Sequence, residues 1–139
     1  MKARAKLIEG MAFLGEAGSG HSVIMDGAPD YGGRNIGFRP MELLLVGLAG
    51  CTAFDVVLIL RKGREDVADC VVEVSAERAA EDPKVFTKIH LSYRVKGKNL
   101  GDAKVKRAVE LSKEKYCSAS IMFGKTAEMT YDYVVEASA

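Results

Sequence analysis

The first 26 residues alternate between apolar and polar positions in a way that predicts three short strands. The stretch KARAKLIE sets small or apolar residues between lysines and an arginine, and MAFLGEA and HSVIMDG follow it. Gly18-Ser19-Gly20 separates the last two stretches, and Asp26-Gly27 closes the third; both are turn signals. We therefore expect a β-meander at the start of the chain.

Period-two alternation also predicts three strands in the second half. Apolar side chains occupy the even positions of 70–76, the odd positions of 85–95 and the odd positions of the stretch TAEMTYDYVVE, and strands covered on one face have this pattern. The expected inward residues are Cys70, Val72, Val74 and Ala76; Val85, Thr87, Ile89, Leu91, Tyr93 and Val95; and Ala127, Met129, Tyr131, Tyr133 and Val135.

A long apolar segment predicts a central helix from Pro40 to about Arg61. Proline suits the first turn of a helix, and Gly63 suits its end. The run 43–60 is close to the length of a membrane span, but Asp55 interrupts it and small residues dilute it. We expect instead a helix buried on most faces. One small domain gives such a helix little cover, which favours a homodimer with this helix in a shared core.

A second, amphipathic helix is predicted over 102–116, and it completes the order βββ-α-ββ-α-β. Val105, Ala108, Val109, Ser112 and Tyr116 recur on one face at helical spacing, with most charges elsewhere. This order predicts an α+β fold in which helices cover antiparallel sheet, as a single domain over residues 1–139.

Composition and charge exclude several classes of protein. The 139 residues are 48% hydrophobic and 28% charged, as in ordinary globular chains. Twenty basic and 19 acidic residues leave a net charge of +1, so no basic surface for nucleic acid is expected. The start lacks the apolar core of a secretory signal, and three cysteines without paired spacing make no disulfide framework. We expect a cytoplasmic protein that does not enter a membrane.

Two cysteines are the candidates for chemistry. Cys51 lies among glycine and alanine on the apolar helix, and Cys117 ends the charged one. Two thiols that meet only after folding would support redox chemistry, in which one attacks and the other resolves. The alternative is that both are buried and act as small hydrophobic residues. Cys70, on the apolar side of its strand, is expected to be a core residue.

Other sites find little support in the sequence. The glycine-rich segment 27–39 lacks the spacing of a phosphate-binding loop, and no cofactor is expected. His21 and His90 have no metal-ligand spacing to a cysteine or an acid, so no metal site is expected. A Cys-His hydrolase would require His21 to fold onto Cys51.

The cysteine segments resemble those of a known family. RPMELLLVGLAGCTAFDVV, followed by KYCSASIMFGKTAEMTYDYVVE, resembles the OsmC/Ohr family of osmotically inducible and organic hydroperoxide resistance proteins. The resemblance implies an OsmC-like fold and an intertwined homodimer with the active sites at its interface. It also implies that Cys51 attacks an organic hydroperoxide to form a sulfenic acid, that Cys117 closes a disulfide, and that an external dithiol reduces it in oxidative-stress defence.

Two family positions are changed here. Peroxidase members carry a glutamate directly after the proline that opens the central helix, and an arginine in the early meander. Here Met41 follows Pro40, Glu42 comes one place later, and the meander stretch 18–27 has no arginine. Arg39 and Glu42 are the candidate helpers, with Arg34 and His21 as further polar groups nearby in the sequence. The alternative function is a small-molecule-binding or redox-sensing dimer with weak or no peroxidase activity.

Overall fold

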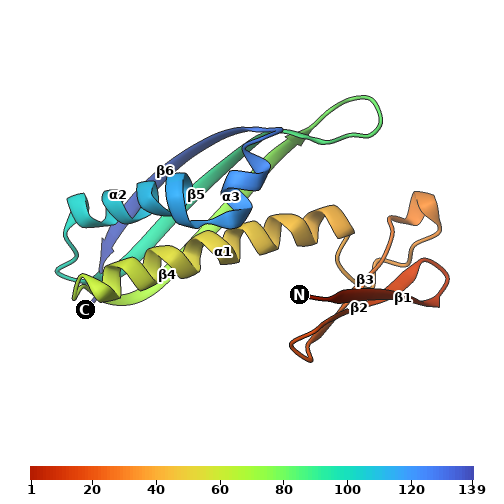
Figure 1. The fold of residues 1–139 in the computed structure, drawn as a ribbon, viewed down its shortest axis with the longest axis horizontal. Helices are drawn as coiled ribbons and strands as arrows, with labels where there is room; N and C mark the ends of the chain where they lie inside the picture. Colours follow the sequence, from red (N-terminus) through yellow and green to blue (C-terminus); the bar gives the residue numbers. More distant parts are fainter. The chain divides into compact units, whose positions relative to one another are not determined.

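The computed structural model describes residues 1–139 as two compact units, Met1–Leu45 and Val46–Ala139 (Figure 1). The boundary falls inside the long helix α1, Pro40–Lys62. Each unit contains one three-stranded sheet, so the predicted α+β class is confirmed.

The first unit is the predicted β-meander. Strands β1 (Ala3–Glu9), β2 (Ala12–Ala17) and β3 (Ser22–Met25) pair antiparallel in the order β1-β2-β3. A 3₁₀ turn over Pro29–Tyr31 follows, and Phe38 then returns to bridge Met25. Most side chains of these short strands remain partly or fully exposed, so this unit has only a small core of its own.

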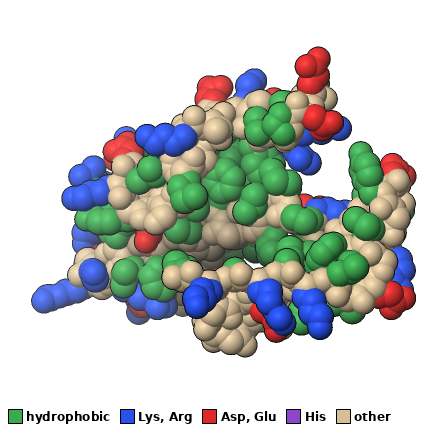
Figure 2. Space-filling model, turned by 45° about the vertical axis from the view of Figure 1, so that its right-hand side comes forward, with side chains coloured by type: hydrophobic (Ala, Val, Ile, Leu, Met, Phe, Trp, Pro, Cys, Tyr) green, Lys and Arg blue, Asp and Glu red, His purple; other side chains and the backbone are tan.

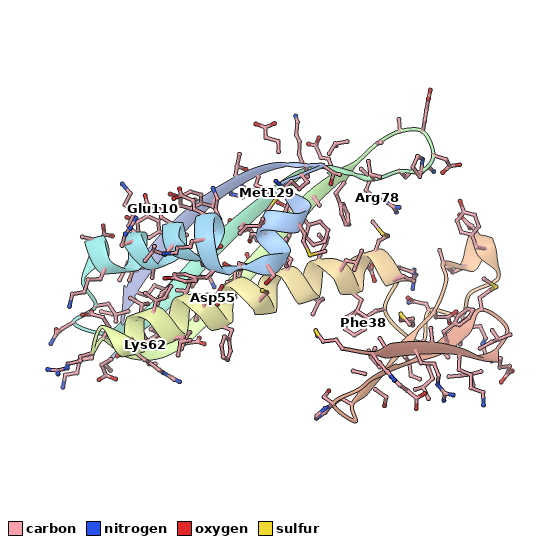
Figure 3. All side chains as sticks on the ribbon, viewed as in Figure 1. Phe38, Asp55, Lys62, Arg78, Glu110 and Met129 are labelled. Atoms are coloured by element: carbon pink, nitrogen blue, oxygen red, sulfur yellow. The ribbon has the colours of Figure 1, made fainter.

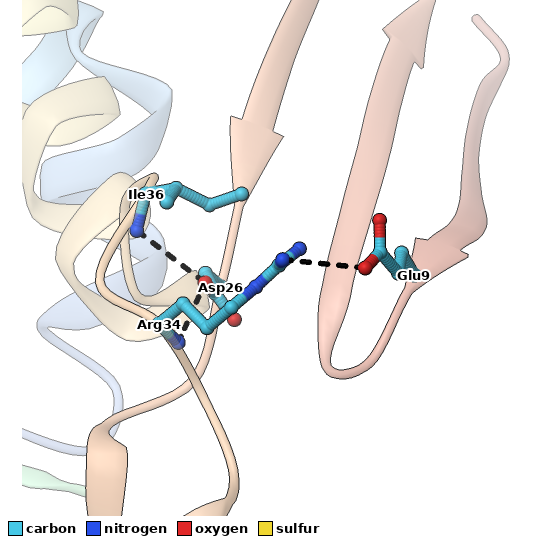
Figure 4. Close-up of polar contacts among 4 residues, drawn as sticks. All are labelled: Glu9, Asp26, Arg34 and Ile36. Atoms are coloured by element: carbon cyan, nitrogen blue, oxygen red, sulfur yellow. Dashed lines mark hydrogen bonds and ion pairs between the residues drawn. The ribbon is translucent and has the colours of Figure 1, made fainter.

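A buried carboxylate organises the glycine-rich loop of this unit (Figure 4). One oxygen of Asp26 accepts the backbone N–H of Gly27 at 2.7 Å, and the other accepts those of Arg34 and Ile36 at 3.0 and 3.3 Å. The Arg34 side chain also pairs with Glu9 at 3.3 Å. The loop thus closes around its own carboxylate and has a structural explanation that needs no bound phosphate.

The second unit is built on a mixed sheet. Strands β4 (Asp66–Arg78) and β5 (Phe86–Lys98) are antiparallel, but β6 (Glu128–Ala137) pairs with β5 in parallel. The expectation of purely antiparallel sheet is therefore wrong for β6. The reason is topological: the chain between β5 and β6 crosses over as a helical segment, and such a crossover returns a strand in the same direction.

Burial follows the predicted alternation in the middle of β5 and fails at its start. Residues 89, 91, 93 and 95 are buried as expected, whereas Val85 and Thr87 are exposed and Phe86 is buried in their place. The register of β4 against β5 shifts between Glu77 and Arg78, opposite this point. A bulge that adds one residue exchanges the two faces of a strand, and this one accounts for the misplaced side chains.

The crossover segment contains more breaks than the single predicted helix. Helix α2 spans Asp102–Leu111, a π-helical turn covers Ser112–Tyr116, and the short helix α3 spans Ser118–Phe123. Val105, Ala108, Val109 and Ser112 are buried as predicted. Tyr116 is exposed instead, because the wider turn changes the helical phase before Cys117.

Helix α1 buries a single stripe within this chain rather than most of its faces. Residues 48, 52, 56 and 60, four positions apart, are its buried members. By length and composition alone the helix could cross a membrane, yet only 22% of its most apolar window is buried. Hydrophobic side chains are accordingly open to the surface, as Figure 2 shows for one face of the molecule. On α1 the large ones are Leu44, Val46, Phe54 and Leu58.

A buried hydroxyl network holds α1 against the rest of the second unit. Thr52 Oγ1 lies 2.7 Å from the Tyr93 hydroxyl on β5 and 2.8 Å from the Ser112 hydroxyl in the π turn. All three side chains are almost completely inaccessible to solvent. Burial raises the pKa of Tyr93 to about 12, so the phenol stays protonated and can donate to Thr52. One threonine therefore fixes the helix to the sheet and to the crossover segment.

Replacing Asp26 by Asn is expected to weaken the first unit in a pH-dependent way. Burial opposes the charged form, but the backbone N–H groups of Arg34, Gly27 and Ile36 and the Arg34 charge hold the pKa of Asp26 below its ordinary value. A lowered pKa stabilises the fold above the unfolded-state value, and this stabilisation is lost as the pH falls through the folded-state value. Urea unfolding at pH 7 should show a deficit for Asp26→Asn that shrinks below about pH 4. An equal deficit at both pH values would contradict this account.

Replacing Thr52 by Val is expected to destabilise the second unit by about 1–3 kcal/mol. Valine keeps the shape but leaves the Tyr93 hydroxyl without its partner and removes one partner of Ser112, and unsatisfied buried groups cost this much. Thr87→Val is the matched control, since Thr87 is exposed on β5, and it should change the unfolding free energy by no more than about 0.5 kcal/mol. Denaturant unfolding of both variants measures the difference.

Candidate functional site

The fold brings Cys51 and Cys117 together. Their sulfur atoms and a carboxylate oxygen of Asp55 all lie within 4.8 Å of one another, and all three residues belong to the second unit. Cys51 and Asp55 come from α1, and Cys117 comes from the junction between the π turn and α3. The two thiols singled out in the sequence therefore form one site, to which the structure adds a carboxylate.

The anchored helix positions Cys51 and Asp55. Cys51 directly precedes Thr52, whose hydroxyl network fixes the rotation of α1, and Asp55 lies one turn later on the same face as Cys51. Figure 3 shows Asp55 on α1 beside the crossover helices. The Ser112 hydroxyl donates to its Oδ2 at 3.2 Å. Cys51 and Asp55 are both partly exposed to solvent.

Local backbone structure positions Cys117. Its N–H donates to the Ser112 carbonyl at 2.8 Å, which closes the π turn. Its backbone is then extended, and its sulfur caps α3 by accepting the N–H of Ser120 at 3.3 Å. The side chain is fully buried. The π turn is what places this thiol inward, where a regular helix would have placed Tyr116.

The environment of Cys117 favours the neutral thiol. Burial raises its pKa, and the neighbouring Cys51 raises it further. The hydroxyl and N–H of Ser120 act in the opposite direction, because both can donate to a thiolate, but they do not cancel the effect of burial. Cys117 is therefore a protonated, shielded thiol at neutral pH, beside a more accessible one.

Arg39 and Glu42 have structural roles at the start of α1. The backbone N–H of Arg39 donates to Glu42 Oε2 at 2.9 Å, which is the return contact of a capping box. The Arg39 guanidinium donates to Asn35 Oδ1 at 2.9 Å and to the Gly37 carbonyl at 3.4 Å. Both residues belong to the first unit, where the structure assigns them to the start of α1 and its helix cap.

The remaining polar candidates also have local partners. His21 lies 3.2 Å from the Ser19 hydroxyl and is exposed. Arg34 takes part in the Asp26 loop. His90, on the outer face of β5, contacts Thr130 and Asp132 at 2.7 Å each. None of these contacts forms a Cys-His pair.

Cys70 lies apart from the thiol pair. It is half-buried rather than a full core residue, and lines a surface hollow with Phe54 and Leu58. Burial, with a smaller contribution from Asp69, raises the pKa of its thiol to about 11. Such a thiol is a poor nucleophile at neutral pH, which makes Cys70 a useful control for the other two.

The residues that support the two thiols carry almost no signal in the sequence. In the sequence Asp55 stands out only as an interruption of the apolar run, and nothing marks Thr52, Tyr93 or Ser120 as part of a site. The single sequence signal was the lone charge of Asp55 inside an apolar helix. A charge in such a place needs a polar partner, and Ser112 provides one.

Comparison with known proteins agrees with this fold. A family model described as OsmC-like protein matches residues 32–132. The chain is 48% identical to Protein YhfA of Escherichia coli (strain K12) over 141 residues, which cover 99% of this chain and 100% of that protein. Two solved structures share the fold at lower identity. They are an OsmC like protein from Mycoplasma pneumoniae (TM-score 0.82, 16% identity, 97% of this chain and 96% of that chain) and the Organic Hydroperoxide Resistance Protein OhrB of Bacillus subtilis (TM-score 0.64, 20% identity, 96% of each chain).

The family match covers well over half of the chain, and it includes both cysteines and all but the last four residues of the two segments that carry the resemblance. The relative at 48% identity spans the chain from end to end. This chain belongs to the OsmC-like protein family.

Proposed function

We propose that this protein is a thiol-dependent peroxidase that reduces organic hydroperoxides in oxidative-stress defence. The observation that carries the proposal is the approach of the Cys51 and Cys117 sulfur atoms to within 4.8 Å in the folded chain. Sulfurs at this separation need only a small movement to bond. The name of the Bacillus subtilis protein of the same fold supports the choice of substrate class.

The proposed reaction uses each sulfur once. The Cys51 thiolate attacks one oxygen of the hydroperoxide, the O–O bond breaks, and the other oxygen leaves as an alcohol after taking a proton. Cys51 is then a sulfenic acid. The Cys117 thiol attacks that sulfur, water leaves, and a disulfide forms. An external dithiol reduces the disulfide and returns both thiols.

The difference in exposure supports this division of roles. Cys51 is partly exposed and can meet a substrate, whereas Cys117 is buried with a raised pKa. A protonated, shielded thiol reacts slowly with peroxide but lies in place to condense with a sulfenic acid next to it. We assign attack to Cys51 and resolution to Cys117.

Activation of Cys51 requires a positive charge, and Asp55 cannot provide one. We propose Arg39 for this role with Glu42 orienting it, supplied by either chain of a homodimer. Asn35 holds the Arg39 guanidinium, and the backbone N–H of Arg39 holds the Glu42 carboxylate, so both groups have defined positions. A homodimer also explains the apolar side chains on α1, since Phe54 is 69% exposed and Val46 51% exposed in the single chain. A second copy of α1 would cover them.

The peroxidase proposal predicts different failures for the three cysteines. Cys51→Ser should abolish consumption of cumene hydroperoxide. Cys117→Ser should consume about one equivalent and stop at a Cys51 sulfenic acid, because nothing resolves it. Cys70→Ser is the control and should match the parent protein, since Cys70 lies outside the site. Single-turnover peroxide consumption by protein that is first reduced and then freed of dithiothreitol, with intact mass and peptide mapping, measures all three.

Two results would contradict the peroxidase proposal. If Cys51→Ser consumed hydroperoxide at the rate of the parent protein, Cys51 would not be the attacking residue. If both thiols stayed reduced after exposure to excess hydroperoxide, the alternative of a small-molecule-binding dimer would replace the peroxidase. The capping roles of Arg39 and Glu42 favour that alternative, because they occupy the two groups proposed to activate the thiol.

The proposed dimer predicts that a charge on the open face of α1 will dissociate it. Phe54→Lys should weaken association by roughly 10- to 100-fold or more, because it removes about 1.5–3 kcal/mol of apolar burial and adds a charge. Val134→Lys is the matched control, because Val134 is 54% exposed on β6. This variant should associate as the parent protein does and show the same mass in solution. Sedimentation equilibrium of both variants measures the association. A monomeric parent protein would refute the dimer.

A further inference from the structure

We propose that the reduced site is also a binding site for a soft divalent cation, Zn²⁺ above all, held by Cys51, Asp55 and Cys117. No metal-ligand spacing in the sequence predicts this site, because two ligands lie on α1 and the third comes from the distant crossover segment. The inference concerns the side chains of the proposed peroxidase site but does not depend on turnover.

The spacing of the three side chains suits one metal ion. Zinc bonds of about 2.3 Å to sulfur and 2.0–2.2 Å to a carboxylate oxygen hold tetrahedral ligands roughly 3.5–3.8 Å apart. The two sulfurs and the Asp55 oxygen already lie within 4.8 Å of one another. Cys51 and Asp55 are one helical turn apart, a spacing that lets two side chains chelate one ion. The ligand atoms therefore need to approach one another by no more than about 1.3 Å to reach this spacing.

Neighbouring groups already orient these ligands. Ser112 donates to Asp55 Oδ2 at 3.2 Å, and the Ser120 N–H donates to Cys117 Sγ at 3.3 Å. In metal sites, such outer hydrogen bonds fix the ligand atoms and strengthen binding. The Ser120 hydroxyl is an independent indication of a ligand at this site. Ser120 is only 4% exposed, and its hydroxyl oxygen has no hydrogen-bond partner. A metal-bound Cys117 thiolate beside this hydroxyl would accept a hydrogen bond from it.

The charge of the site favours a cation. With both sulfurs as thiolates, the three ligands carry three negative charges, and no lysine or arginine forms an ion pair with Asp55. Two thiolates select zinc over magnesium or calcium, which prefer oxygen ligands. Three protein ligands leave a fourth position, which water can fill because Cys51 and Asp55 are partly exposed.

Binding and oxidation compete for the same sulfurs. Zn²⁺ displaces one proton from each thiol and leaves a complex with one net negative charge, in which both sulfurs are engaged by the metal. Oxidation of the pair by hydroperoxide to a disulfide removes both sulfur ligands and releases the ion. The site would therefore hold zinc when reduced and lose it when oxidised.

The test titrates the reduced full-length protein with Zn²⁺ against a chromophoric chelator and with Co²⁺ as a spectroscopic probe. We expect one ion per chain and a thiolate-to-cobalt charge-transfer band. Cys51→Ser and Asp55→Asn should each weaken zinc binding by roughly 10- to 100-fold or more, because loss of a hydrogen-bond partner of a metal ligand already has an effect of this size. Cys70→Ser, the matched cysteine control, should bind as the parent protein does.

Several results would overturn the site: no stoichiometric binding, a cobalt complex without thiolate absorption, or binding that Cys70→Ser abolishes and Cys51→Ser does not. If a variant misfolds, the parent protein still decides the question. Oxidation to the Cys51–Cys117 disulfide with diamide should abolish binding, and dithiothreitol should restore it. Peroxidase activity is measured separately with chelator present. A protein that binds zinc but consumes no peroxide would refute the proposed function alone, and the reverse result would refute the metal site alone.

Discussion

The buried hydroxyl of Thr52 is the contact on which the rest of the site depends. It joins α1 to β5 through Tyr93 and to the π turn through Ser112, and Ser112 continues the chain to Asp55. Apolar packing alone permits a helix to rotate or slide at little cost, whereas a buried hydroxyl with two partners is satisfied in one orientation. Because each residue turns a helix by about 100°, this contact decides which way Cys51 points. The position of the thiol pair follows from a hydrogen bond made by the neighbouring residue.

The π turn performs the corresponding task on the opposite side. A regular continuation of α2 would have turned Tyr116 toward the core and Cys117 away from it. The wider turn instead exposes Tyr116 and buries Cys117, and the Ser112 carbonyl and the Ser120 N–H then hold the cysteine at both of its ends. Ser112 belongs to both devices, since its hydroxyl faces Thr52 and its carbonyl accepts from Cys117. The two cysteines are thus positioned by one shared residue.

The sequence predicted those features that depend on local pattern. Alternation located the meander and the middle of β5, and apolar length located α1. The local pattern did not predict features of the fold that depend on residues distant in the sequence. β6 is parallel because of the path of the crossover, and Phe86 is buried because β5 has an extra residue, Thr87, where it pairs with β4. The cysteines could be found from their segments, but their meeting, the hydroxyl network and the role of Asp55 join residues 41 to 66 positions apart, which no local period reveals.

One electrostatic constraint links the chemistry proposed for this site. Two sulfurs that are close together and next to a carboxylate cannot both be thiolates without compensation, because burial and like charge disfavour the charged forms. Three changes relieve the conflict: a proton stays on Cys117, a disulfide removes both ionisable sulfurs, or a cation neutralises them. The first describes a resolving thiol at rest, the second its oxidised product, and the third a metal complex. A site of this composition is therefore suited to redox chemistry and to metal binding for the same reason, and the availability of oxidant or cation decides which form it takes.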